Sequence, residues 1–322
     1  MQDLRISLIQ SDLKWEDKAY NLSHLSSLID SINEASDIIV LPEMFTTAFS
    51  MKPEVFAEEI HGESLEWMQK QAEKKQAAIV GSFMVKDAGK YYNRLYFVKP
   101  DETFEQYDKR HLFRMGNEQE HFSQGEKPLI LEYKGWKIQT LICYDLRFPI
   151  WAKNTYNNGE YGYDACILVA NWPAVRSQVW KTLSSARAIE NQAYWIGVNR
   201  IGMDGHGLDH SGDSNIWDAK GNTMMEQASS QEFVKTITIS KTKLDDFRGK
   251  FTVGLDWDFG FAQSPIGSAQ SPIGSAQSPI GSAQSPIGFA QSPIGFAQSP
   301  IGFAQSPIDK IVKPIHELAQ RQ

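Results

Sequence analysis

The stretch that decides the fold reads Ile138-Gln139-Thr140-Leu141-Ile142-Cys143-Tyr144-Asp145-Leu146-Arg147-Phe148-Pro149. It begins as an apolar run typical of a buried strand, and its polar, aromatic and proline residues then turn the chain. Cys143 stands where the strand gives way to the turn. In open α/β sheets the reactive groups lie just beyond the carboxyl ends of strands, so we treat Cys143 as a candidate nucleophile.

Strand and helix patterns alternate on both sides of this stretch. Apolar residues at three- and four-residue spacing predict helices, and apolar runs rich in β-branched and aromatic residues predict strands. The predicted strands cover residues 4–9, 37–43, 77–85, 92–98, 103–107, 165–170, 194–199, 214–217, 223–226 and 233–239, and the predicted helices cover residues 19–32, 64–75 and 175–189. Two such α/β halves predict a four-layer α-β-β-α sandwich, with a doubly wound single sheet as the alternative.

The composition is that of a globular protein, since 41% of the 322 residues are hydrophobic and 22% are charged. The net charge of −7 comes without a basic stripe, which argues against nucleic acid as a partner and fits an enzyme for small molecules. With only two cysteines, Cys143 and Cys166, we expect free thiols and no cysteine-based zinc site. No signal-peptide pattern or membrane-length apolar run is present, so we expect a cytoplasmic protein.

Residues 261–308 consist of a seven-residue repeat, Phe/Ser-Ala-Gln-Ser-Pro-Ile-Gly, without charged residues until its end. Every copy contains proline and glycine, which break helices, so we predict a disordered or extended tail rather than a coiled coil. The chain is therefore divided into a globular domain, residues 1–260, the repeat, and a C-terminal segment, residues 309–322. We expect the repeat to be dispensable for chemistry.

Three reactive side chains share one topological position, because Glu43, Lys109 and Cys143 each end or directly follow a predicted strand. Strand ends on the same edge of a sheet converge, so a carboxylate, an ammonium group and a thiol can meet in one pocket. A nearby cation stabilises a thiolate, and a carboxylate can accept the thiol proton. Taken singly, each residue has a plainer interpretation as a surface charge or as a buried, inert cysteine, which we expect of Cys166.

Three segments resemble the signature segments of the nitrilase superfamily of carbon-nitrogen hydrolases. They are Leu41-Pro42-Glu43-Met44-Phe45, Tyr107-Asp108-Lys109-Arg110-His111-Leu112-Phe113 and Cys143-Tyr144-Asp145-Leu146-Arg147-Phe148-Pro149. Residues 171–173, 186–192 and 199–205 further resemble its omega-amidase branch, bacterial enzymes that deamidate 2-oxoglutaramate. The resemblance spans about residues 3–258 and implies a four-layer α-β-β-α fold, usually dimeric or larger.

The resemblance also implies roles in amide hydrolysis. Cys143 would attack the amide carbon, while Glu43 takes the thiol proton and later delivers it to the departing ammonia. Lys109 and the backbone N–H of Tyr144 would hold the oxyanion, and water activated by Glu43 would hydrolyse the thioester. The scheme uses no metal or organic cofactor. The expected substrate is the terminal amide of a small 2-oxo-dicarboxylate monoamide, such as 2-oxoglutaramate or 2-oxosuccinamate.

The family has a second glutamate between the lysine and the cysteine, commonly seven residues before a glycine. Glu118, which precedes Gly125 by seven residues, matches best, and Glu120 is its competitor. The matching residue would orient Lys109 or the substrate.

Two further residues are candidates for substrate binding. Arg147, four residues after the nucleophile, could form a fork with a substrate carboxylate or take part in a structural ion pair. Trp172 could wall the pocket or pack in the core. Arg187 and Glu190, three residues apart on a predicted helix, are expected to pair with each other.

A group of histidines and aspartates is the strongest candidate for a metal site: His206, Asp209, His210 and Asp213. Histidines four apart suit a helix, but three glycines within residues 205–212 predict a loop, so we expect no metal there. The family commonly has an aromatic residue near His210, and this sequence departs from the family there.

Other activities remain open from the sequence. Within the superfamily, the substrate could be another amide, a carbamoyl amine or a nitrile. From a different class, the chain could be an inactive scaffold whose repeat tail binds partners. The completeness of the three-residue set favours the amidase.

Overall fold

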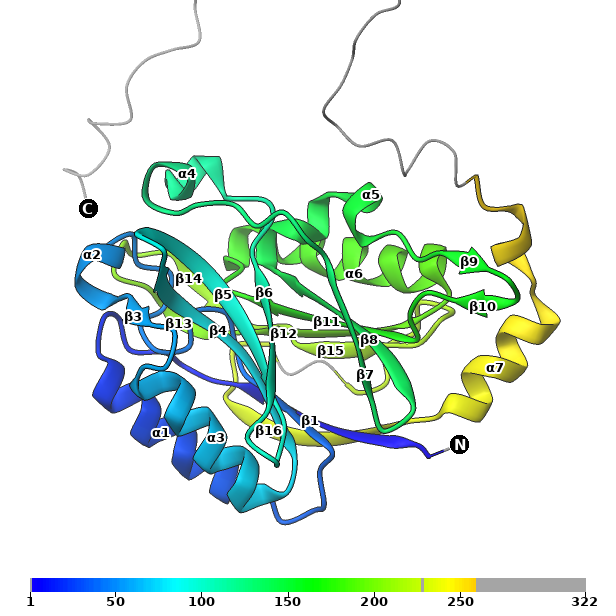
Figure 1. Cartoon of the computed structure of the whole chain (residues 1–322), viewed down its shortest axis with the longest axis horizontal. Helices are drawn as coiled ribbons and strands as arrows, with labels where there is room; N and C mark the ends of the chain where they lie inside the picture. Colours follow the sequence, from blue (N-terminus) through cyan, green and yellow to red (C-terminus); the bar gives the residue numbers. More distant parts are fainter. Residues whose placement is uncertain (1, 227–228, 259–322) are drawn as a thin grey trace, which may run out of the picture. The chain divides into compact units, whose positions relative to one another are not determined.

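The computed structural model describes residues 2–226 and 229–258, which build two β-sheets with helices on their outer faces (Figure 1). Helices α1 (Lys18–Asp30) and α3 (Glu63–Lys75) lie outside one sheet, and α6 (Ser177–Asn191) lies outside the other. The predicted repeat at 261–308 and the segment 309–322 lie outside the described residues.

The first sheet has seven strands in the order β16-β1-β2-β4-β5-β6, with β3 paired to β4. They are β1 (Leu4–Gln10), β2 (Ile38–Val40), β3 (Glu58–Glu59), β4 (Ala78–Asp87), β5 (Lys90–Val98), β6 (Phe104–Asp108) and β16 (Phe233–Ile239). The central strands β1, β2 and β4 are parallel, and β5, β6 and β16 extend the sheet by antiparallel pairing.

Strand β2 shows why this sheet needs a continuous apolar run. Ile38 and Val40 belong to the core shared by the two sheets, whereas Ile39 belongs to the core beneath α1 and α3. Successive side chains of a strand point to opposite faces, so a strand buried on both faces cannot alternate with polar residues.

The second sheet has five strands in the order β15-β12-β11-β8-β7. They are β7 (Leu129–Tyr133), β8 (Trp136–Ile142), β11 (Ala165–Ala170), β12 (Tyr194–Asn199) and β15 (Asn215–Trp217). Strands β8, β11 and β12 are parallel, so their carboxyl ends lie at one edge. The core between the sheets contains side chains from both, including Val80, Phe97 and Ile167.

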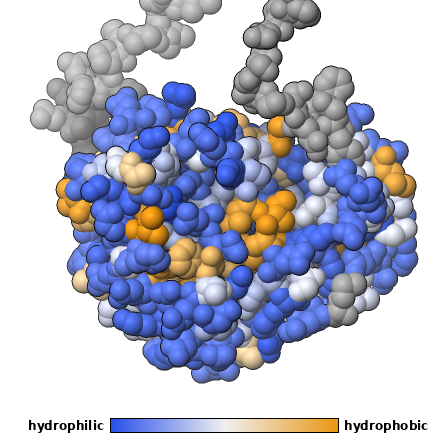
Figure 2. Space-filling view, viewed as in Figure 1, coloured by the Kyte–Doolittle hydropathy of each residue, from blue (hydrophilic) through white to orange (hydrophobic). Residues whose placement is uncertain are grey.

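Most predicted elements are present, one predicted strand is absent, and the alternative topology is excluded. The structure has two separate sheets and therefore not the alternative single doubly wound sheet. Residues 223–226 form no strand, because Thr223 makes only an isolated bridge with Trp217. The face seen in Figure 2 is largely hydrophilic, with a group of hydrophobic side chains near its centre.

Shorter elements complete the described chain. They are α2 (Pro53–Phe56), α4 (Glu118–His121), α5 (Pro149–Ala152), α7 (Lys241–Lys250), the hairpin of β9 (Tyr156–Asn157) and β10 (Glu160–Tyr161), the hairpin of β13 (Ile201–Met203) and β14 (Asp209–Ser211), and the 3₁₀ turns η1 (Arg114–Gly116), η2 (Cys143–Arg147), η3 (Ala174–Arg176) and η4 (Val253–Asp256). None of the helices within 2–226 and 229–258 combines the length and apolarity needed to cross a bilayer.

Candidate active site

Cys143 lies directly after β8, at the first residue of the η2 turn. Its φ is +43°, in the left-handed region that non-glycine residues seldom occupy. Ile142, one residue earlier, is still extended. The chain therefore turns sharply at the thiol, and backbone strain of this kind is concentrated at functional sites.

The buried carboxylate of Asp145 holds this turn in place. Its Oδ2 accepts hydrogen bonds from Ile142 N (3.0 Å) and from the hydroxyl of Tyr107 (2.8 Å). Its Oδ1 accepts from His111 N (3.0 Å) and lies 2.8 Å from His111 Nδ1. The His111 ring in turn stacks on Phe148 at 3.6 Å between ring centres. These contacts join the turn after β8 to the segment after β6.

Arg187 supports the same turn from helix α6. Its Nε and Nη2 donate to the carbonyl oxygen of Leu146 at 3.1 and 2.8 Å. Its Nη1 donates to Glu190 Oε1 at 2.9 Å, which confirms the predicted pair. The sequence pattern gave no sign of the contact with Leu146.

Lys109 lies between two carboxylates. Its Nζ donates to Glu43 Oε1 at 2.8 Å and to Glu118 Oε1 and Oε2 at 3.0 and 2.9 Å. All three side chains are fully buried. The structure therefore brings Glu118, and not the exposed Glu120, to Lys109.

Two asparagines complete the hydrogen bonding of this buried cluster. Asn93 Nδ2 donates to Glu43 Oε1 at 2.8 Å and to Glu118 Oε1 at 3.2 Å. The backbone N of Asn171 donates to Glu43 Oε2 at 2.8 Å. Sequence reasoning missed Asn93, although a polar residue at the start of the buried part of β5 was an available signal.

Gly125 explains how the chain carrying Glu118 returns to Lys109. Its backbone N donates to the carbonyl oxygen of Lys109 at 2.9 Å. A Cβ at Gly125 would lie 2.1 Å from the carbonyl oxygen of Asp108, which is an impossible contact. Glycine at this position therefore allows the close approach that brings Glu118 and Lys109 together.

Burial and charge set the protonation of these groups. Burial lowers the pKa of Lys109, but the carboxylates of Glu118 and Glu43 outweigh it and raise that pKa above its usual value. Burial, and then Glu43, raise the pKa of the Cys143 thiol well above its ordinary value, and the opposing effect of Lys109 is smaller. The expected stabilisation of the thiolate by Lys109 is therefore outweighed, and the resting sulfur holds its proton.

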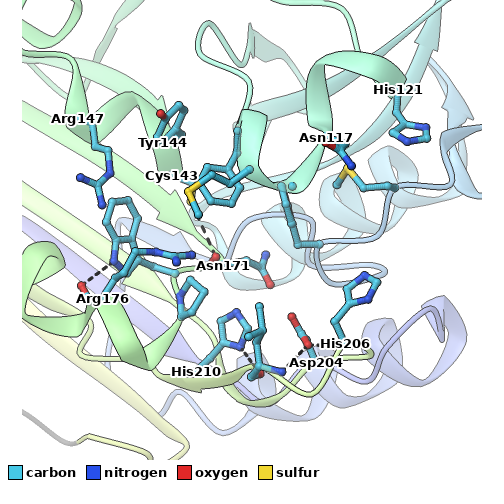
Figure 3. Close-up of a pocket in the computed structure, with 18 residues that line it drawn as sticks. Asn117, His121, Cys143, Tyr144, Arg147, Asn171, Arg176, Asp204, His206 and His210 are labelled. Carbon is cyan, nitrogen blue, oxygen red and sulfur yellow. Dashed lines mark hydrogen bonds between the residues drawn. The ribbon is translucent and has the colours of Figure 1, made fainter. Parts of the chain in front are cut away.

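Cys143 opens onto a cavity of about 440 Å³ (Figure 3). Tyr144, Arg147 and Trp172 also line the cavity, whereas Glu43 and Lys109 are among the fully buried residues that do not line it. The charged cluster therefore lies behind the cavity wall and next to Cys143, since Glu43 and Lys109 both act on the pKa of its thiol. Cys166 is fully buried in β11 and is absent from the cavity wall, as the sequence predicted for an inert cysteine.

Arg147 and Trp172 form one wall of the cavity. The Arg147 guanidinium lies 5.2 Å from the centre of the Trp172 ring. Within residues 2–226 and 229–258 it pairs with no carboxylate, so the structural ion pair considered from the sequence is absent. Trp172 is 4% exposed, and its Nε1 donates to the carbonyl oxygen of Arg176 at 2.9 Å. The Trp172 ring therefore packs in the core and also lines the cavity.

The histidine and aspartate group is spread over a hairpin and the segment after it. His210 lies in β14, which corrects the expected loop, and both His210 and His206 line the cavity. Asp209 is exposed, and Asp213 instead pairs with Lys181. Across the described ranges, no three His, Cys, Asp or Glu side chains are grouped in a way that suits a metal ion.

The comparisons with known proteins agree with this geometry. The carbon-nitrogen hydrolase family matches residues 5–249. Omega-amidase YafV of Yersinia enterocolitica is 40% identical over 260 residues, which cover 80% of this chain and 98% of that protein. The 2-oxoglutaramate amidase of Bacillus subtilis is 31% identical over 233 residues, covering 71% of this chain and 88% of that protein.

A solved structure extends the likeness to three dimensions. The crystal structure of XC1258 from Xanthomonas campestris, a CN-hydrolase superfamily protein with an arsenic adduct in its active site, has a TM-score of 0.78 and 41% identity. The match covers 80% of this chain and 98% of that one. The chain belongs to the carbon-nitrogen hydrolase family and is a hydrolase of carbon-nitrogen bonds other than peptide bonds.

Proposed function

We propose that this hydrolase removes the terminal amide of a small 2-oxo-dicarboxylate monoamide, such as 2-oxoglutaramate or 2-oxosuccinamate, through a thioester on Cys143. The observation that carries the proposal is the buried Glu43–Lys109–Glu118 cluster next to a thiol that faces a cavity. The guanidinium of Arg147 on the cavity wall, which pairs with no carboxylate among the described residues, fits a carboxylate at the far end of the substrate. The names of the omega-amidase relatives point to the same substrate class.

In the first half-reaction, the Cys143 sulfur attacks the amide carbon and its proton passes to Glu43. The raised pKa of the thiol makes this transfer necessary, because the free enzyme holds little thiolate at neutral pH. The developing oxyanion is stabilised by the backbone N–H of Tyr144 and by the ammonium group of Lys109. When the carbon-nitrogen bond breaks, Glu43 gives its proton to the nitrogen, and ammonia leaves a thioester.

In the second half-reaction, water attacks the thioester carbon while Glu43 accepts one of its protons. The carbon-sulfur bond breaks, the sulfur recovers its proton from Glu43, and the dicarboxylate product is released. Glu118 and Asn93 hold Lys109 and Glu43 in place throughout, because Lys109 donates to Glu118 and Asn93 donates to Glu43 in the resting enzyme. Every proton transfer in the two half-reactions goes to or from a protein residue.

The test is mass spectrometry of protein quenched during turnover of 2-oxoglutaramate. We expect an acyl adduct on the peptide containing Cys143, and we expect Cys143→Ala to abolish ammonia release while the protein still folds. Full ammonia release by the Cys143→Ala variant would refute the thioester. A panel of an oxo-acid amide, a carbamoyl amine and a nitrile, followed by ammonia release, separates this substrate class from the family's alternatives.

We further propose that the enzyme is cytoplasmic, assembles as a homodimer or larger homo-oligomer, and needs no repeat tail for chemistry. Exposed apolar side chains on α5 and α6, Ile150 and Ile189, support a surface that a second copy covers. Truncation after residue 261 is expected to leave turnover unchanged. A loss of turnover on truncation would show that the tail contributes to catalysis.

A further inference from the structure

Arg176 is a second guanidinium on the cavity wall, and the sequence did not single it out. It ends the η3 turn, directly before α6. Its carbonyl oxygen accepts the indole N–H of Trp172, and its guanidinium lies 5.4 Å from the centre of the Phe113 ring. Trp172 thus touches both arginines, since its ring also lies under Arg147. In Figure 3, Arg147 and Arg176 lie on the same side of the cavity.

These two arginines differ from the buried arginines of the domain in their charge balance. Arg94, Arg200 and Arg248 each form an ion pair with an aspartate. Over the described part of the chain, neither Arg147 nor Arg176 pairs with a carboxylate. Each guanidinium therefore keeps planar N–H donors available to a ligand in the cavity.

The cavity wall as a whole has an excess of positive charge. Among the lining residues that the structure describes, Asp204 is the single carboxylate, against the two arginines. Its Oδ1 already accepts the backbone N–H groups of His206 and Leu208. One negative charge on the ligand balances this wall, which is the charge of a 2-oxo-dicarboxylate monoamide.

We propose that Arg176 is a specificity-determining residue that, together with Arg147, clamps the carboxylate end of the substrate. This inference rests on the proposed function and adds Arg176 to Arg147 as a second group that binds the substrate carboxylate. Two guanidiniums, one over the Trp172 ring and one over the Phe113 ring, can engage neighbouring oxygens, so the clamp fits a carboxylate with an adjacent 2-oxo group better than an isolated carboxylate. Uncharged amides leave both arginines without a partner and are expected to bind poorly.

The experiment measures how well 2-oxoglutarate protects Cys143 from alkylation by iodoacetamide, read by mass spectrometry of the Cys143 peptide. The reagent is uncharged, so its rate without ligand reports an intact thiol environment. Arg176→Met is expected to raise the half-protecting concentration about 10- to 100-fold, as for loss of a hydrogen bond to a charged group, with the unprotected rate unchanged. Arg176→Lys is expected to recover part of the protection.

The matched control is Arg114→Met, which removes an exposed guanidinium from the neighbouring η1 turn and is expected to leave protection unchanged. Equal protection of the wild-type and Arg176→Met proteins would overturn the inference, and so would an absence of protection in the wild type. A change in the unprotected alkylation rate of both Arg176→Met and Arg176→Gln would assign Arg176 a structural part instead. Ammonia release from 2-oxoglutaramate is measured separately, so failure of the proposed reaction is seen independently of carboxylate binding.

Discussion

The exchange of Glu118 for glutamine tests the central cluster most directly. Each oxygen of this carboxylate accepts two donors: Oε1 accepts from Asn93 Nδ2 and Lys109 Nζ, and Oε2 accepts from Phe113 N and Lys109 Nζ. The amide nitrogen of a glutamine would therefore face donors in either orientation. The variant loses a charge-assisted hydrogen bond, worth about 1.5–3 kcal/mol, and leaves a buried donor unsatisfied, at about 1–3 kcal/mol.

We expect this loss to appear both in stability and in turnover. The free energy of unfolding of Glu118→Gln should fall by about 3 kcal/mol. Because Lys109 is no longer held on that side, its contribution to the oxyanion weakens, and kcat should fall about 100- to 1000-fold, as when an oxyanion donor is removed. KM should change little, since Glu118 does not line the cavity.

The assay is ammonia release from 2-oxoglutaramate, with urea unfolding of the same samples. Glu120→Gln is the matched control, because Glu120 is exposed on the same short helix and should leave both quantities unchanged. If Glu118→Gln retained kcat within threefold of the wild type, roughly 0.6 kcal/mol, the assignment of Glu118 as the group that holds Lys109 would be wrong.

Three further predictions follow from contacts described above. Asp145→Asn places an amide nitrogen among three donors and the His111 ring, and we expect kcat to fall about 10- to 100-fold with a lower melting temperature, measured by turnover and calorimetry. Alkylation of Cys143 by iodoacetamide should accelerate with pH around a midpoint above the ordinary thiol value of about 8.5, and a midpoint below it would contradict the raised pKa. Burial raises the pKa of Asp37, but Arg5 and Lys134 outweigh it and hold that pKa at about 2. Because this folded value lies below the unfolded value of about 3.9, the stabilisation is complete above that pH and is lost as pH falls towards 2. Asp37→Asn should therefore lower the free energy of unfolding by about 1–2 kcal/mol at pH 7 and by almost nothing near pH 2, measured by urea unfolding.

The fold was predictable where burial on both faces dictates composition. The runs at 165–170 and 194–199 are strands with the predicted boundaries, because both faces of β11 and β12 are covered and nearly every side chain in them is apolar. The sheet to which β16 belongs was not predictable. Its pairing with β1 joins residues more than 200 positions apart, and no local pattern encodes that partner.

The part of the site that follows strand ends was predictable, because the end of a strand determines where the next side chain lies in the sheet. Glu43 and Lys109 meet as expected because each follows a strand of the same sheet. Asn93 and Arg176 escaped notice for different reasons. Asn93 acts through a single amide inside a strand, and Arg176 reaches the cavity from a turn whose direction depends on the packing of Trp172. Such contacts arise from tertiary packing, which residue spacing does not specify.

The left-handed backbone at Cys143 has a consequence for how this enzyme can change. A side chain in that conformation costs roughly 1 kcal/mol that glycine would avoid, so the backbone at the thiol is strained. Under the proposed function, Cys143→Gly would relieve this strain and remove the nucleophile. Cysteine at this residue would then serve turnover at a cost in backbone conformation.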